Sequence, residues 1–204
     1  MEKDISTEER IKETARKLFI EKGFGSTRTR EIAEAAGINS ALLNYYFRSK
    51  ERLFEIIMME SVQEMFAFIF ETIQSTTTTL SQKIDSIISH YIDIFLRNPN
   101  LPLFVLNEIQ SNPERFMQRS TVPHDALLAS PFYMELTEHL NKKNIDIIPL
   151  HFFVNMISMS IMPVIAKPIV GYLHNMNEEQ YIAFIEERRK FIPMWVKSTI
   201  KLDE

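Results

Sequence analysis

The stretch TRTREIAEAAGINSALLNYYFRSKERL, from Thr27 to Leu53, decides the fold of the N-terminal part of the chain. Apolar residues recur at helical spacing on both sides of Gly37, and a glycine permits the tight turn between two helices. A helix-turn-helix needs a short first helix, such a turn, and a second helix whose N-terminal half presents small or polar groups. The stretch therefore predicts a helix over residues 27–36, a turn at Gly37 and a second helix from Ser40.

Working outward from this stretch, the whole chain reads as helix. Ser6-Thr7-Glu8-Glu9 is typical of a capping box and Gly23 of a helix C-terminus, which predicts a helix over 7–22. Ser49-Lys50 opens a further helix. Strand alternation is absent, and the remaining periodic windows are 53–74, 81–98, 102–110, 113–120, 131–144, 149–167 and 177–201. The fold class is all-α, with a loop at 76–79.

Composition divides the chain into two parts. The protein has 204 residues, and three of its four glycines lie in the first 40, whereas all nine prolines lie at Pro99 or later. Residues 1–54 carry 11 Lys and Arg against 9 Asp and Glu, and the remainder carries 12 against 18. We therefore predict a mildly basic N-terminal domain at 1–52 and a larger helical domain at 53–204.

The sequence contains no cysteine, which excludes disulfides and cysteine nucleophiles. All five histidines lie after residue 55, and no two of them stand at the i, i+4 spacing of a metal-binding helix. No nucleophile elbow, P-loop or paired acid and base is visible. We predict a protein that is not an enzyme, holds no metal and needs no cofactor. The N-terminus has no apolar signal-peptide stretch and no membrane span is expected, so the predicted location is cytoplasmic.

The N-terminal residues resemble the TetR family of bacterial transcriptional regulators. The resemblance covers roughly the first 55 residues, where Ile32-Ala33, Ala36-Gly37-Ile38, Tyr46-Phe47 and Lys50-Glu51-x-Leu53 stand at the family's spacing. Beyond them only length and helical character match. The likeness implies an N-terminal helix-turn-helix domain and a larger helical domain for ligand binding and dimerisation.

The resemblance also implies roles for single residues toward double-stranded DNA. Base edges would be read by the outward face of the second helix of the motif, Asn39, Ser40, Ala41 and Asn44. Phosphate contacts would come from Thr29, Arg30, Tyr45, Tyr46 and Lys50. Where the family usually has a Thr or Ser cap this chain has Arg28, so we expect Thr27 to cap the helix and Arg28 to be an extra phosphate contact.

The larger domain holds ten of the eleven methionines and most of the phenylalanines. Such side chains either fill the core or line an adaptable apolar pocket. The residues we single out for a small-molecule effector are Phe66, Phe70, Tyr91, Phe95, Phe104, Asn107 and Phe116. In the resembling family the last two helices pair with their copies, which implies a homodimer interface containing Phe152, Met156, Met159, Ile185, Ile192, Trp195 and Val196.

The hypothesis that joins these observations is a homodimeric, ligand-responsive regulator of transcription. It would act as a repressor that an apolar small molecule releases from a palindromic operator. Two other functions are compatible with the sequence. One is a helical carrier of hydrophobic ligands, and the other is an interaction factor that uses DNA only as a tether.

Overall fold

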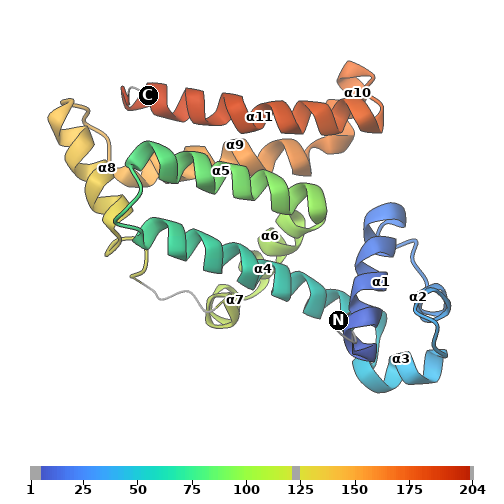
Figure 1. The fold of residues 1–204 in the computed structure, drawn as a ribbon. Helices are drawn as coiled ribbons and strands as arrows, with labels where there is room; N and C mark the ends of the chain where they lie inside the picture. Colours follow the sequence, from blue (N-terminus) through green and yellow to red (C-terminus); the bar gives the residue numbers. More distant parts are fainter. Residues whose placement is uncertain (1–5, 121–124, 203–204) are drawn as a thin grey trace. The chain divides into compact units, whose positions relative to one another are not determined.

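The computed structural model describes residues 6–120 and 125–202, and within these ranges the chain forms helices and no strands. The prediction of an all-α fold is confirmed. The chain divides into two compact units, Met1–Val62 and Gln63–Glu204 (Figure 1). The division falls inside α4 (Lys50–Gln74), ten residues after the boundary that composition suggested.

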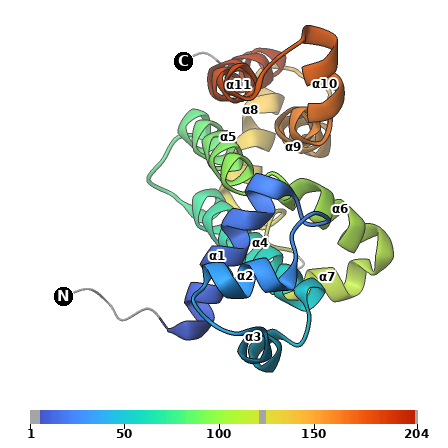
Figure 2. The same ribbon diagram turned by 90° about the vertical axis from the view of Figure 1, so that its right-hand side faces the viewer.

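The first unit contains α1 (Thr7–Lys22), α2 (Thr29–Ala35), α3 (Ser40–Phe47) and the beginning of α4. Helix α2 packs against both α1 and α3 (Figure 2). The apolar periodicity read from the sequence becomes a continuous core whose members are almost fully buried: Ile11, Ala15, Phe19, Ile32, Leu43, Phe47, Leu53 and Ile57. This core holds the two short helices at a fixed angle to each other.

Two features of the chain make the turns of this unit. Gly37 has a φ of +67°, and the neighbouring Ile38 N–H donates a 3.0 Å bond to the Ala33 carbonyl, which closes the end of α2. Thr27 does not cap α2, contrary to the prediction. Its buried hydroxyl donates 2.8 Å to the Gly23 carbonyl, so it fastens the end of α1, and α2 begins two residues later than expected.

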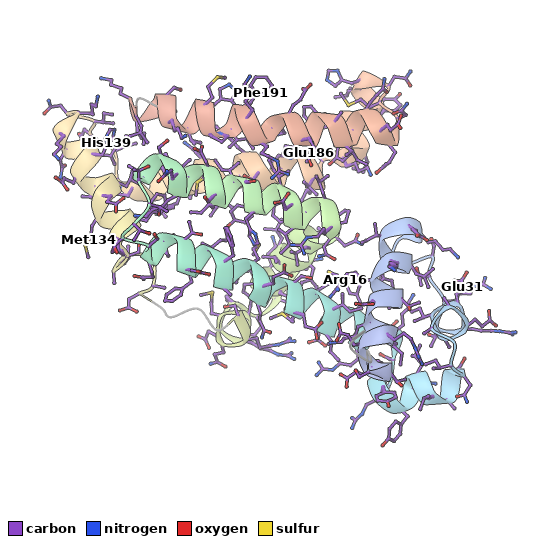
Figure 3. All side chains as sticks on the ribbon, viewed as in Figure 1. Arg16, Glu31, Met134, His139, Glu186 and Phe191 are labelled. Atoms are coloured by element: carbon purple, nitrogen blue, oxygen red, sulfur yellow. The ribbon has the colours of Figure 1, made fainter. Side chains whose placement is uncertain are left out.

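The second unit is built around α5, whose apolar side chains are buried along most of its length. Its helices are the remainder of α4, then α5 (Leu80–Arg97), α6 (Leu101–Ser111), α7 (Pro113–Ser120), α8 (Pro131–Lys142), α9 (Pro149–Ile165), α10 (Lys167–His174) and α11 (Glu178–Thr199). Helices α5, α9 and α11 pack against one another (Figure 1). On α8, His139 Nε2 lies 2.8 Å from the Ile200 carbonyl and so ties α8 to the end of α11 (Figure 3).

Helix α10 was not predicted from the sequence. We expected one helix over 149–167, but α9 ends at Ile165 and a separate helix begins at Lys167. Pro168 stands in the first turn of α10, where its missing N–H costs nothing. Among the described residues, no single helix is long and apolar enough to cross a membrane. Helices α9 and α10 meet that criterion only together, and they are bent by 67°.

A proline inside α9 is compensated from α11. Pro163 has no N–H, so the carbonyl of Met159 one turn earlier loses its helical donor. Arg188 supplies a replacement, because its Nη2 donates a 2.8 Å bond to that carbonyl. The guanidinium also lies 5.5 Å from the centre of the Trp195 ring. Helices α9 and α11 are therefore joined by a hydrogen bond to the carbonyl that Pro163 leaves without its helical donor.

Candidate functional site

The side chains predicted to reach base edges lie on one exposed face at the start of α3. Asn39 is the N-cap of that helix, and its Oδ1 accepts a 2.8 Å bond from the Leu42 N–H. Leu43 and Phe47 on the opposite face are buried. All of the predicted base-reading residues are exposed: Asn39, Ser40, Ala41 and Asn44. The sequence thus divides α3 into an anchored face and a free face.

The start of α2 carries a second exposed group of polar side chains. The Arg28 N–H donates a 2.8 Å bond to Glu31 Oε2, and Lys22 lies 2.9 Å from the same carboxylate. The Arg28 N–H and, next, Lys22 lower the pKa of Glu31. Arg28 and Arg30 are exposed, although Arg30 pairs with Glu34 at 2.7 Å. The exposed arginines lie beside a helix N-terminus, which favours anions.

Two tyrosines and a lysine complete the predicted phosphate contacts. Tyr45 is 80% exposed, and its ring meets Tyr46 edge-on at 5.5 Å between centroids. Lys50 is half-buried, and its Nζ donates 2.9 Å bonds to the carbonyls of Phe24 and Thr27. The same ammonium lies 4.3 Å from the centre of the Phe24 ring. Lys50 therefore joins α4 to the loop before α2 and keeps one N–H for another partner.

The second unit contains an apolar cavity of about 180 Å³. Helix α4 contributes Phe66, Ile69, Phe70 and Ile73, and α5 contributes Ile87 and Tyr91. The remaining lining residues are Phe153, Met156 and Ile157 of α9 together with Ala126 and Leu127 before α8. Three helices and one loop thus contribute to a space lined by apolar side chains, one of them the thioether of Met156, and a single phenol.

Three of the seven residues singled out for an effector line this cavity, namely Phe66, Phe70 and Tyr91. The other four do not. Phe95 and Phe116 are buried in the core, Phe104 is half-buried and Asn107 is exposed. Within residues 6–120 and 125–202, no three His, Asp or Glu side chains come together in a way that could hold a metal ion.

Comparisons with known proteins agree with the helix-turn-helix arrangement of the first unit. Residues 11–57 match the N-terminal family model described as "Bacterial regulatory proteins, tetR family". The chain is 26% identical over 206 residues to a Bacillus subtilis (strain 168) protein named "Probable HTH-type transcriptional regulator YttP", which covers 97% of this chain and 95% of that one. Residues 11–57 therefore form a DNA-binding domain of the TetR family. The matches support a DNA-binding transcriptional regulator and not an enzyme.

Two further similarities concern named regulators. The chain is 27% identical over 126 residues to the transcriptional repressor KstR2 of Mycolicibacterium smegmatis (strain ATCC 700084 / mc(2)155), covering 55% of this chain and 61% of that one. It shares its fold with the regulator FadR of Bacillus subtilis, solved in complex with stearoyl-CoA. That comparison has a TM-score of 0.54 at 17% identity and covers 90% and 96% of the two chains.

The residues that we predicted for a dimer interface need correction. Five of the seven are buried within their own chain: Phe152, Met156, Ile185, Ile192 and Val196. A side chain in its own core has almost no area left to bury against a second copy, and Met156 lines the cavity instead. Met159 is half-buried, and Trp195 is 40% exposed. The exposed surface of these helices is formed by other apolar residues on the same helices, which the hydrophobic periodicity did not distinguish from core residues.

Some site residues were missed altogether. Phe24 was not singled out, although its ring and carbonyl hold Lys50. Seven cavity residues were also missed, because periodicity does not distinguish an apolar residue beside a void from one beside another side chain: Ile69, Ile73, Ile87, Ala126, Leu127, Phe153 and Ile157. Only the buried phenol of Tyr91 carried a chemical signal, and that residue was found.

Proposed function

We propose that this protein is a homodimeric TetR-family repressor that binds a palindromic operator and leaves it when an apolar small molecule enters the second unit. The observation that carries the proposal is the free face of α3, whose polar residues have no packing role, in a chain that also contains an apolar cavity. DNA binding is assigned to the first unit, and ligand binding and dimerisation to the second. The cytoplasm, where operators are found, is the proposed location.

In this proposal the two exposed groups of the first unit have different tasks. Asn44 pairs with an adenine edge and Ala41 contacts a thymine methyl group in the major groove. Arg28, Thr29 and Tyr45 contact phosphates and fix the register of the helix. Lys50 can give a phosphate its third N–H while the other two hold the loop. Arg30 must leave Glu34 before it reaches DNA.

The proposed interface between copies uses the exposed apolar surface of α9, α10 and α11. Its main members, which we call the C-terminal face, are Val154, Met162, Tyr172, Leu173, Met194 and Trp195, all exposed in the single chain. Helix α10 has no buried residue of its own, and its apolar side chains Ile169, Tyr172 and Leu173 are exposed. Exposed apolar surface of this extent is typical of a protein interface.

Two parts of the proposal, repression of transcription and release from DNA by a ligand, are supported by similar proteins rather than by this chain alone. KstR2 is named a repressor, and FadR of Bacillus subtilis was solved with stearoyl-CoA. Release requires only that the ligand favours a dimer whose α3 helices no longer match half-sites one helical turn apart. A coupling of about 1–3 kcal/mol between the two sites is typical of allosteric proteins.

The operator is found by selecting bound sequences from random duplex DNA with the full-length protein. We expect a two-fold symmetric consensus. Asn44→Ala should relax one position of each half-site, whereas Arg28→Ala should weaken binding to all sequences and reduce the salt dependence by about one phosphate contact per subunit. Binding without sequence preference, equal in all three proteins, would overturn the proposal.

A further inference from the structure

The cavity of the second unit is small. At about 180 Å³ it lies below the range of roughly 300–1,000 Å³ that drug-sized ligands occupy. It is only slightly larger than an engineered apolar cavity of about 150 Å³ that binds benzene. In this conformation the space therefore accepts one six-membered ring with two or three further heavy atoms.

The walls of the cavity exclude a charged ligand. Its lining side chains include no Lys, Arg, His, Asp or Glu among the residues that the structure describes. A carboxylate or phosphate inside it would lose its hydration and gain no counter-ion. The part of a ligand that lies inside the cavity is therefore neutral.

One polar group remains to be satisfied. Tyr91 is 5% exposed and lines the cavity, and its hydroxyl makes no hydrogen bond with any described residue. Burial raises the pKa of this phenol, so it stays protonated and can donate. A ligand that fills the cavity can satisfy this hydroxyl with a hydrogen-bond acceptor.

We propose that the effector is a neutral compound about the size of one aromatic ring, with a single acceptor oxygen that receives the Tyr91 hydroxyl proton, as an aryl ketone or ester would. The identification rests on the proposed function, in which this cavity is the effector site. It separates this protein from the FadR structure solved with stearoyl-CoA, because a long acyl chain and a charged head group fit neither the volume nor the lining.

The test compares acetophenone with α-methylstyrene, which has the same shape but a methylene in place of the carbonyl oxygen. Titration calorimetry on the full-length protein should show acetophenone binding about fivefold more tightly, as one net hydrogen bond predicts. Tyr91→Phe should remove the difference and leave α-methylstyrene unchanged. Tyr133→Phe deletes a hydroxyl beside the cavity wall, where Tyr133 stacks on Phe153, and should keep the difference.

Two further measurements test the predicted size and charge of the ligand. Ala126→Phe places a ring in the cavity and should abolish binding of both compounds, with circular dichroism confirming that it folds. Benzoate and stearoyl-CoA should bind at least tenfold more weakly than acetophenone. Tighter binding of either one, no binding of acetophenone, or an unchanged preference in Tyr91→Phe would overturn the proposal. Operator release is measured separately, so acetophenone that binds without releasing DNA contradicts only the proposed function.

Discussion

Lys50 Nζ lies 4.3 Å above the ring of Phe24 and donates a 2.9 Å hydrogen bond to the carbonyl of the same residue. The residue that the family resemblance assigns to phosphate thus has a task inside the protein. It joins the start of α4 to the loop that precedes α2. The proposed phosphate contact would therefore link stability and DNA affinity at this one side chain.

The first prediction concerns the task of Lys50 inside the protein. Lys50→Met should lower the free energy of unfolding by about 1–2 kcal/mol. It removes two partly buried hydrogen bonds, to the carbonyls of Phe24 and Thr27, and a cation–π contact with Phe24. Urea unfolding followed by circular dichroism measures the change. Lys17→Met removes an exposed lysine from α1 and should change stability little. If both variants unfold at the same urea concentration, Lys50 has no structural role.

The sequence predicted the first unit almost completely. The helix over 7–22 was predicted to the residue, because an N-cap serine and a glycine mark its two ends. Leu43 and Phe47 were assigned to the core from their spacing. The error at Thr27 arose because a threonine before a helix can cap that helix or fasten the preceding one, and only the three-dimensional position of Gly23 decides.

The second unit was predicted less well, for two physical reasons. Pro168 was treated as a stop signal, although a proline also suits the first turn of a helix, and α10 was therefore missed. Periodicity identifies an apolar face but not what covers it. Ile192 and Met194 are both apolar residues of α11, yet Ile192 is in the core and Met194 is 49% exposed.

The second prediction concerns Arg188 and the carbonyl that Pro163 leaves without a donor. Arg188→Leu should cost about 1–2 kcal/mol, because the Met159 carbonyl loses its 2.8 Å bond. In a Pro163→Ala background the new N–H at residue 163 can serve that carbonyl. The same Arg188→Leu change should then cost about 1 kcal/mol less.

This double-mutant cycle isolates the hydrogen bond from the other contacts of Arg188. Its guanidinium also lies over the rings of Phe184 and Trp195, at 5.7 and 5.5 Å, and those contacts are lost equally in both backgrounds. Urea unfolding of the four proteins gives the coupling energy. Equal costs in the two backgrounds would show that Arg188 acts only through its ring contacts.

The third prediction tests the C-terminal face as a dimer interface. Met194→Glu should yield a monomer by analytical ultracentrifugation, because a carboxylate would be buried at the centre of an apolar contact. The sole tryptophan, Trp195, stands beside it and should shift its emission to longer wavelength as it becomes solvated. Emission and sedimentation therefore report the same event independently.

A matched substitution elsewhere distinguishes this result from a general effect of added charge. Met134 on α8 is 60% exposed and lies outside the C-terminal face (Figure 3). Met134→Glu should leave both the sedimentation coefficient and the emission of Trp195 unchanged. A monomeric Met134→Glu, or a dimeric Met194→Glu, would place the interface on another surface.

The last prediction concerns pH and His90, which stacks on Phe68 with 4.0 Å between ring centres. Burial lowers the pKa of His90 below about 6.5, against an opposing effect of Glu64, and its buried Nε2 has no hydrogen-bond partner among the described residues. The folded state therefore binds a proton less readily than the unfolded chain. The contribution of His90 to stability is complete above pH 6.5 and is lost as the pH falls toward the folded pKa.

The Tm should accordingly be lower at pH 5.5 than at pH 7.5. His90→Phe keeps a ring against Phe68 and cannot be protonated, so the difference in Tm between the two pH values should shrink. His174→Phe, on the exposed end of α10, provides the control and should keep the full difference. Because the neutral imidazole is the form that the folded protein prefers, an equal pH response in His90→Phe would mean that other groups cause it.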